Sequence, residues 1–386
     1  MKPFVYYEGI FLDNTNYLTY MSRKNRELSN KPYQSAVIND LSNIDIVLSP
    51  KTSELLMETI EVLSKLDGFV KEKLIAFPML LLRTEALSSS QIEHYRASNR
   101  NVALAQLSKK NTAEAKIIQS NLEALISSVN NQRKIDLELI IEMHRNLMHE
   151  GELNLKDEGI RKVVNWIGSS NQLPHEADYV PPHPKHLSTY MNQLVSFVNR
   201  KDLHPLIIAA FSHAYFEIIH PFSDGNGRVG RILIQVILKQ SLFLENIYVP
   251  FSVELVKDPK KYIHALNVFK DGNYEEIIKL LLDNALQIVP KVYKALDAML
   301  SLKDSWHIKL DVRKDALAWK ILDDLLIQPV LDVKYIKNKH DANDQAVRNN
   351  IEILLDSGII SKIGNEKRDV AYECKEVLEI LDQFAI

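Results

Sequence analysis

The chain has 386 residues, of which 46% are hydrophobic and only 11 are glycine, which predicts two or three domains with buried helical cores. Its 47 basic and 50 acidic side chains nearly cancel, so the whole chain has no electrostatic signature for nucleic acid or an anionic membrane. The single cysteine, Cys374, excludes an intrachain disulfide, and without an apolar run of ~20 residues or a signal-peptide pattern we expect a soluble, cytoplasmic protein with no membrane partner.

In chain order, residues 1–52 are mixed in character, with one short extended candidate at residues 4–7 and no repeat. From Ser53 apolar residues recur at spacings of three and four, which is typical of helices. Helical patterns continue through residues 113–129 and 136–148, a hairpin-like segment interrupts them, and helices return from residue 187 to about residue 300. The pattern predicts a mainly α fold.

A polar stripe crosses one of the early helices. Glu85, Ser89 and Glu93 are spaced by four residues and so share one helical face, whereas Ile92 serves another. Taken alone, such a stripe is more often a solvated face than a functional one. Only its coincidence with a second polar motif, at residues 220–231, favours the functional interpretation.

The most informative segment is residues 220–231, His-Pro-Phe-Ser-Asp-Gly-Asn-Gly-Arg-Val-Gly-Arg. It combines a titratable base, a carboxylate, a glycine-flanked turn and two arginines, the groups needed to handle a polyphosphate with a divalent cation. The apolar run that follows predicts a buried helix, which would place the turn at a helix N-terminus that favours anions. An ordinary tight loop between helices is the alternative, but such a loop needs neither the His/Asp pair nor the arginines.

The segment before this loop, residues 205–219, is apolar on nearly every face. It predicts a central buried helix that carries His220 at its C-terminal end. His213, two turns earlier, is interpreted as a core histidine. No Gly-Lys-Ser/Thr follows the loop and no strand precedes it, which argues against a Walker loop and a dinucleotide fingerprint.

Residues 220–231 closely resemble the signature of Fic (Fic/DOC) proteins, which transfer the AMP moiety of ATP to a hydroxyl side chain of a target protein. Two further segments are similar to features of that family. Residues 165–184 resemble the flap, a hairpin over the nucleotide and the target segment. Residues 89–94, Ser-Ser-Gln-Ile-Glu-His, resemble the inhibitory motif Ser/Thr-x-x-x-Glu followed by Gly or Asn. His94 stands in place of that Gly or Asn, and His is less suited to a left-handed helix end.

The resemblance implies a role for each matched residue. His220 would be the catalytic base, Asp224 the Mg²⁺ ligand, and Ser89 and Glu93 the inhibitory residues, with Glu93 competing for Arg231. ATP would be the substrate. The nucleotide-binding residues implied are Gly225, Asn226, Gly227, Arg228, Val229, Gly230, Arg231, Ile167, Gly168, Ser169, Ser170 and Tyr262.

By this interpretation, residues 1–52 form an N-terminal extension and residues 53–300 a Fic core. The core has an inhibitory helix near residues 80–97, a flap at 165–184 and an active-site loop at 220–231. Residues 310–386 predict a winged-helix-like domain, with helices at 316–326, 330–339 and 344–355 and a hairpin after them. From residue 313 onward there are 11 basic and 14 acidic residues, a net charge of −3, which favours protein interaction or dimerisation over DNA binding.

We therefore expect a protein adenylyltransferase that modifies Ser, Thr or Tyr of a target protein, with self-modification and a homodimer as open options. Three alternatives remain: a deAMPylase of the same fold that uses Glu93, transfer of UMP, phosphate or phosphocholine instead of AMP, and a nucleotide-sensing transcriptional regulator.

Overall fold

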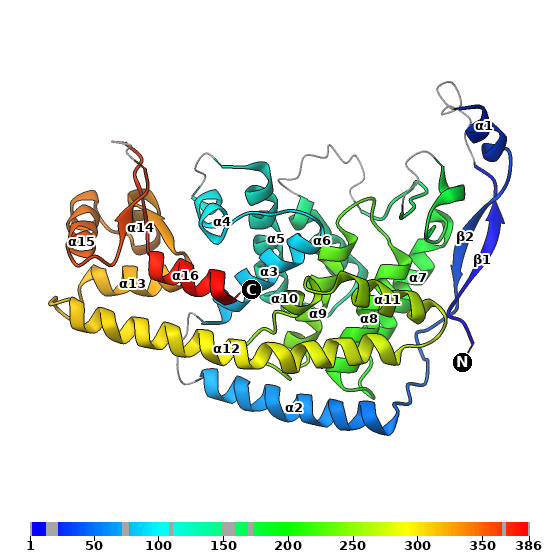
Figure 1. Cartoon of the computed structure of the whole chain (residues 1–386), viewed down its shortest axis with the longest axis horizontal. Helices are drawn as coiled ribbons and strands as arrows, with labels where there is room; N and C mark the ends of the chain where they lie inside the picture. Colours follow the sequence, from blue (N-terminus) through cyan, green and yellow to red (C-terminus); the bar gives the residue numbers. More distant parts are fainter. Residues whose placement is uncertain are drawn as a thin grey trace.

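The computed structural model describes residues 2–12, 22–71, 77–107, 111–148, 159–168, 173–364 and 368–384. These residues form an elongated, mostly helical molecule with a two-stranded hairpin at one end and a small three-stranded sheet at the other (Figure 1). The mainly α class expected from the sequence is confirmed. Within the described ranges, no helix has the length and apolar character needed to cross a membrane.

The elements, in chain order, are β1 (Val5–Ile10), α1 (Arg23–Ser29), β2 (Tyr33–Ile38), α2 (Pro50–Lys71), α3 (Phe77–Ile92), α4 (Asn99–Gln106), α5 (Ala113–Val129), α6 (Leu137–Met148), the 3-10 helix η2 (Pro174–Glu176), α7 (Pro184–Val198), α8 (Pro205–Ile219), α9 (Asn226–Gln240), α10 (Ser252–Leu255), α11 (Pro259–Lys270), α12 (Glu275–Lys309), α13 (Leu317–Ile327), β3 (Val330–Asp332), α14 (Val333–His340), α15 (Asp344–Asp356), β4 (Ser361–Lys362), β5 (Ala371–Glu373) and α16 (Lys375–Phe384).

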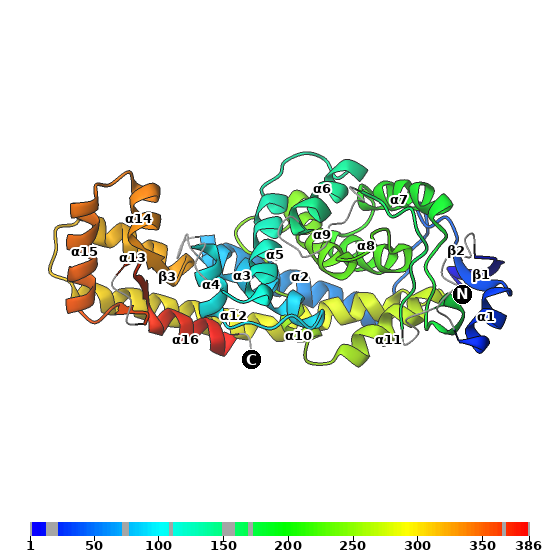
Figure 2. The same ribbon diagram turned by 90° about the horizontal axis from the view of Figure 1, so that it is seen from above.

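Helix α8 is the centre of the core. It begins with Pro205 after His204, whose ring accepts a hydrogen bond from the backbone N–H of Leu206, and nearly all of its side chains are buried. It packs against α7, α9, α11 and α12, so it is covered on several sides (Figure 2). A helix with apolar residues all round is stable only when enclosed in this way, and the enclosure fixes the position of its C-terminal end.

The N-terminal hairpin is anchored to this core. Strands β1 and β2 are antiparallel, with Val5 opposite Ile38 and Ile10 opposite Tyr33. Phe4 packs its ring edge against Phe269, at 5.2 Å between ring centroids. The backbone N–H of Ala36 in β2 donates to the carbonyl of Val180, at 2.9 Å, so the hairpin also holds the segment after η2.

The C-terminal part, residues 310–364 and 368–384, follows α12, a single helix of 35 residues that extends out of the core (Figure 1). Its three strands pair antiparallel in the order β3-β5-β4, and a helix, a strand, two helices and two strands follow one another along the chain, while the winged-helix assignment stays a prediction. The expected helix over 330–339 was wrong in its first three residues, because Val330–Asp332 pairs with β5 and Asp332 then caps α14. Helix α16 was not anticipated, and it packs on α12, α4 and α3.

Candidate active site

His220 lies at the C-terminal end of α8, as the sequence predicts. Its backbone is left-handed, with φ 51° and ψ 60°, and its N–H donates to the carbonyl of Phe216 at 2.9 Å, which closes the helix. A non-glycine residue in this conformation is uncommon and requires support from its surroundings. Here the support is a buried arginine that the sequence analysis missed.

Arg161 is only 1% exposed and holds three backbone carbonyls together. Its guanidinium donates to the carbonyls of His220 (2.9 Å), Val163 (2.9 Å) and Pro182 (2.6 Å), and its own N–H donates to the carbonyl of Pro221 at 2.9 Å. Arg161 therefore fixes the backbone of the base and both ends of the flap in one contact network. The sequence offered no signal for this role beyond an arginine shortly before the flap.

The imidazole of His220 is held in its neutral form. Burial and then the charge of Arg161 lower the pKa of His220 to about 4. At neutral pH the ring is therefore unprotonated and can accept a proton from an incoming hydroxyl.

The loop after His220 is closed by Asn226. Its amide accepts from the N–H of Phe222 (2.9 Å) and donates to the carbonyl of Phe222 (2.8 Å). Gly225 supplies the left-handed residue that the turn needs, with φ 78°, and α9 begins at the next residue. Asn226 is 2% exposed, so its side chain shapes the loop, while direct contact of this amide with phosphate stays a prediction.

A second residue missed by the sequence analysis supports the loop from α6. His144 stacks on Phe222, with 3.9 Å between ring centroids and 4° between planes, and its Nε2 donates to the carbonyl of Asp224 at 3.0 Å if that nitrogen carries the proton. Burial lowers the pKa of His144 to about 4, so it is neutral at physiological pH. Phe222 itself is fully buried, as an apolar anchor of the loop should be.

The carboxylate of Asp224 is the group best placed to hold a cation. Its side chain is 43% exposed, and its Oδ2 lies 3.8 Å from Arg228. Its Oδ1 accepts the N–H of Gly225 at 2.6 Å, which fixes the orientation of the carboxylate. Among the described residues no three acidic, His or Cys side chains gather into a ready-made metal cage. One carboxylate with open coordination fits Mg²⁺, which is usually held by one or two carboxylates together with substrate phosphates.

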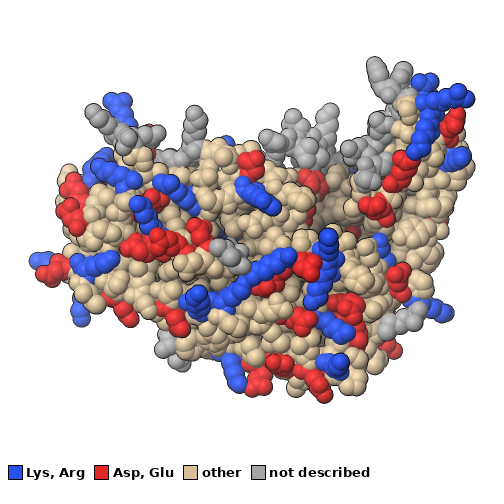
Figure 3. Space-filling view, in the orientation of Figure 1, with Lys and Arg blue, Asp and Glu red and all other residues tan. Residues whose placement is uncertain are grey.

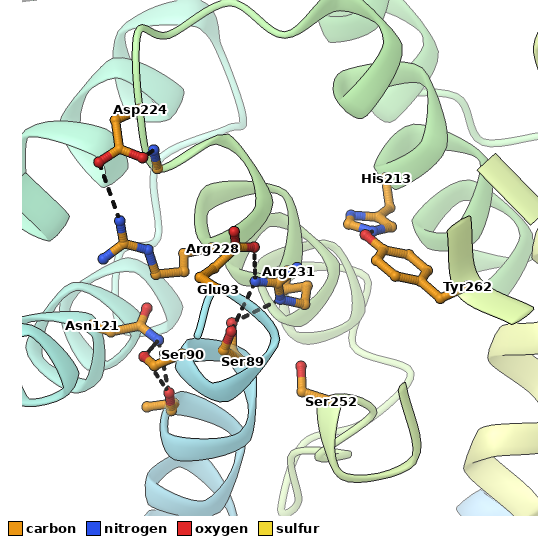
Figure 4. Close-up of polar contacts among 12 residues, drawn as sticks. Ser89, Ser90, Glu93, Asn121, His213, Asp224, Arg228, Arg231, Ser252 and Tyr262 are labelled. Atoms are coloured by element: carbon orange, nitrogen blue, oxygen red, sulfur yellow. Dashed lines mark hydrogen bonds and ion pairs between the residues drawn. The ribbon is translucent and has the colours of Figure 1, made fainter. Parts of the chain in front are cut away.

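Arg231, on the second turn of α9, meets the polar stripe of α3 (Figure 4). Its Nε donates to the Ser89 hydroxyl at 2.8 Å, and its Nη2 donates to the Ser89 carbonyl at 2.9 Å and to Glu93 Oε1 at 2.7 Å. Burial is the largest single effect and lowers the pKa of Arg231, but the charge and hydrogen bond of Glu93 together with the neighbouring Tyr262 and Glu217 raise this pKa above its usual value. Burial likewise favours the neutral form of Glu93, yet Arg231 keeps the pKa of Glu93 below its usual range. The two groups form a charged pair.

The Glu93 carboxylate lies against the first turn of α9. A Cβ atom at Gly227 would collide with Glu93 Oε1, so only glycine permits this approach. The carboxylate therefore sits where the free N–H groups of the helix N-terminus favour an anion. Two buried donor nitrogens near it, Nε of Arg228 and Nη1 of Arg231, have no hydrogen-bond partner within the part of the chain that the structure describes. An arriving polyphosphate would find these donors.

His94 adopts the left-handed conformation at the end of α3, although its side chain is less suited to this conformation than Gly or Asn. Helix α3 ends at Ile92, five residues before the expected end, and His94 has φ 68°. The N–H of Tyr95 donates to the carbonyl of Ser90 at 3.0 Å, the long-range bond of a left-handed helix end. The ring of Tyr95 then lies against Arg228, 5.1 Å from the guanidinium carbon.

The remaining predicted residues have varied placements. Ile167 pairs with Tyr179 through two backbone hydrogen bonds, which forms the flap ladder, and Gly168 lies close against Asp178. Tyr262 is buried beside Arg231 with its hydroxyl 2.7 Å from His213 Nε2. Ser169 and Ser170 lie outside the described residues.

Two residues of the loop serve packing. Val229 is fully buried, so only its backbone is available to a nucleotide. A Cβ at Gly230 would lie 2.7 Å from Glu217 Oε1, which indicates close approach of α8 and α9. Burial raises the pKa of Glu217 to about 8, and it is therefore neutral at pH 7 and does not compete with Glu93 for Arg231.

Taken together, the fold and site define a helical protein in which a helix N-terminus, the kind of position that favours anions, lies beside a neutral histidine and a carboxylate. Residues 134–238 match the family model of the Fic/DOC family. The chain therefore carries a domain of the Fic/DOC family.

Curated relatives share this region. The protein adenylyltransferase Fic of Nematostella vectensis is 28% identical over 295 residues, which cover 71% of this chain and 64% of the relative. The protein of the same description from Aedes aegypti is 31% identical over 159 residues, 40% of this chain and 28% of the relative. The match thus spans less than two thirds of the length of either relative.

Solved structures share the fold. A Fic family protein from Desulfovibrio desulfuricans G20 superposes with a TM-score of 0.55 at 19% identity, over 86% of this chain and 98% of that chain. Fic-1 from C. elegans gives a TM-score of 0.50 at 18% identity, over 64% and 74% of the two chains.

The left-handed conformation of His94 gives a stability prediction. Asn adopts this conformation more readily than His, so His94→Asn should stabilise the protein by about 0.5–1 kcal/mol and raise the midpoint of thermal unfolding. His94→Ala keeps the unfavourable conformation and should show no gain. A lower midpoint in His94→Asn would mean that the His94 side chain makes a contact worth more than the strain.

Proposed function

We propose that this protein is a protein adenylyltransferase that transfers AMP from ATP to a hydroxyl side chain of a target protein, releasing diphosphate. The observation that carries the proposal is the neutral His220 next to the anion-binding start of α9, with Asp224 and Arg231 on the same loop and helix. The descriptions of the curated relatives support the same activity. In the reaction the hydroxyl oxygen bonds to the α phosphorus, the bond to the β phosphate breaks, and His220 takes the hydroxyl proton.

The phosphates would be held by the loop and by two arginines. The N–H groups of residues 226–228 in the first turn of α9 have no intrahelical partners and suit the α and β phosphates. Arg228 and Arg231 are 3% and 1% exposed, so their guanidinium groups would act on the outer phosphates in a site with little screening by water. Asp224 would hold Mg²⁺, which would neutralise charge on the phosphates.

We also propose that Glu93 keeps this activity low. It occupies Nη2 of Arg231 and the space over Gly227, which the γ phosphate would need. While the ion pair persists, ATP is bound without its outer phosphate in place, and the α phosphate is misaligned for attack.

Binding of DNA by the C-terminal part is not favoured by its charge. Acidic and basic side chains are interspersed over the face shown in Figure 3, and Lys337 is already paired with Asp344 at 2.7 Å. Helix α15, in the position of a recognition helix, has Arg348 against Asp344 and Glu352. Duplex binding depends on neutralising several phosphates, which this surface does not offer.

The experiment that tests the proposal is incubation of the Glu93→Gly protein with Mg²⁺ and α-labelled ATP, with and without cell lysate. Labelled protein bands should appear, and their labelling should exceed that of the wild type because Arg231 is free. Arg231→Ala added to Glu93→Gly should cancel the gain. If Glu93→Gly binds ATP normally but labels nothing above wild type, autoinhibition is wrong, and loss of Glu93 should then be tested for loss of AMP removal from a modified target.

His220→Ala in the Glu93→Gly background should reduce AMP transfer by about 10²-fold or more and leave the dissociation constant of MgATP nearly unchanged. The imidazole acts on the incoming hydroxyl and not on the phosphates. Single-turnover labelling and equilibrium nucleotide binding measure the two effects. Parallel loss of binding and transfer would assign His220 a structural role.

The lowered pKa of His220 also predicts the pH dependence. Since the base works when unprotonated, kcat/KM of the Glu93→Gly protein should rise through about pH 4 and stay level between about pH 6 and 8. The measurement uses excess Mg²⁺ and a far-ultraviolet check that the protein stays folded. A rise of kcat/KM centred near pH 6.5, the ordinary pKa of histidine, would contradict the lowering of the His220 pKa by burial.

Asp224→Ala should abolish the Mg²⁺ dependence of ATP binding, because no other carboxylate lies within the loop. Asp224→Asn is the matched variant that keeps the shape and the hydrogen bond from Gly225. Binding of ATP with and without Mg²⁺ gives the readout. Equal Mg²⁺ dependence in the wild type and both variants would place the ligand elsewhere.

A further inference from the structure

Helix α3, which carries Glu85, Ser89 and Glu93, is also held through a residue on another of its faces. Arg83 lies on this helix ten residues before Glu93 and is 3% exposed. Its Nη2 donates to Gln328 Oε1 at 2.7 Å and to Gln106 Oε1 at 3.1 Å. Gln328 follows α13 in the C-terminal part of the chain and in turn donates to the carbonyl of Ala103 at 2.7 Å.

Arg83 is a buried cation with amide partners in place of a carboxylate. Burial lowers its pKa to about 10, which still leaves it charged at neutral pH. A buried charge is stable only while its hydrogen bonds are made, so Arg83 requires Gln328 to remain where it is. The position of α3 is therefore tied to the C-terminal part of the chain.

The segment after Glu93 is tied to the same part. Arg100 of α4 forms a bidentate ion pair with Glu373 of β5, with 2.6 Å between Nε and Oε2 and 3.2 Å between Nη2 and Oε1. Asn99 donates to Asp382 of α16 at 2.8 Å. Below these contacts a small apolar cluster, Ala103 with Val330 and Ala371, joins α4 to the C-terminal sheet.

These contacts lie on both sides of Ser89 and Glu93 along the sequence. Arg83 lies upstream and Asn99 and Arg100 lie downstream of Ser89 and Glu93, and all three are held by residues from 328 to 382. Only residues 93–98 separate α3 from α4. A displacement of the C-terminal part would therefore act on α3 and α4 together, and Glu93 lies between them.

We propose that the C-terminal part works as a clamp that sets the strength of the Glu93–Arg231 contact, with Arg83, Asn99 and Arg100 as positioning residues. Release of the clamp lets the end of α3 move and frees Arg231 for the γ phosphate. This inference rests on the proposed function only for its catalytic readout. It gives the C-terminal module a regulatory role in place of DNA binding.

The clamp is tested in the full-length protein with Arg100→Ala and, separately, Arg83→Met. Each should increase AMP transfer about five-fold or more, the size of a typical coupling between sites, because Glu93 is held less firmly. Lys337→Ala is the matched control, since Lys337 lies in the same C-terminal part but pairs with Asp344, away from α3 and α4, and it should leave transfer unchanged. Arg100→Lys keeps a charge next to Glu373 and should retain most of the inhibition.

Epistasis separates the clamp from a general structural role. In the Glu93→Gly background, Arg100→Ala and Arg83→Met should have no further effect on transfer, because the contact they control is gone. If they lower transfer in both backgrounds, or raise it equally in both, the clamp is wrong. Thermal unfolding identifies any variant that fails to fold, and Arg100, which is 44% exposed, provides the milder of the two substitutions.

Hydrogen exchange and nucleotide affinity give readouts that do not need AMP transfer. In Arg100→Ala the amides of residues 86–98 should exchange faster while those of α13 and α15 stay protected, and MgATP should bind more tightly than to the wild type. If these changes appear but no variant, Glu93→Gly included, transfers AMP, the proposed function fails and the clamp stands. If exchange and affinity are both unchanged, the clamp fails whatever the activity.

Discussion

The site depends on one buried cation, the guanidinium of Arg231, which requires an anionic partner. Arg231 is 1% exposed, and its charge cannot remain in the core without a partner. Glu217 is nearby but is neutral because burial raises its pKa, and Ser89 supplies only neutral oxygens. The anionic partner is Glu93, or a phosphate in its place. A competition between a carboxylate and a phosphate for the same guanidinium is therefore built into the site.

Such a competition works only if the carboxylate is held in position. A typical exposed ion pair contributes at most about 1 kcal/mol, whereas shifting a population from 1:99 to 99:1 takes about 5.5 kcal/mol. Further contacts hold α3. Glu85 accepts from both the N–H and the hydroxyl of Ser252, and Asn121 donates to the Ala86 carbonyl at 2.9 Å. These contacts lie on a buried polar face, so the helix cannot rotate without leaving polar groups unpaired.

Part of this arrangement follows from the sequence, because it depends on local patterns. The apolar run before His220 predicts a buried helix, the Gly-Asn-Gly turn predicts the start of the next one, and the four-residue spacing of Glu85, Ser89 and Glu93 predicts a shared face. The contacts that connect distant segments did not follow. Arg161 and His144 support the loop from positions 59 and 80 residues away, and nothing in their local sequence marks them. Strand β3 looked helical because its pairing partner lies about forty residues later.

In the proposed mechanism, Glu93 and the γ phosphate exclude each other at Arg231. The most direct measurement is the affinity for ATP relative to ADP, by titration calorimetry of the wild type and of Glu93→Gly in the presence of Mg²⁺. The wild type should bind the two nucleotides with similar affinity, because Arg231 is occupied, and Glu93→Gly should gain a clear preference for ATP. An ATP preference that is the same in both proteins would show that Glu93 does not compete with the γ phosphate for Arg231.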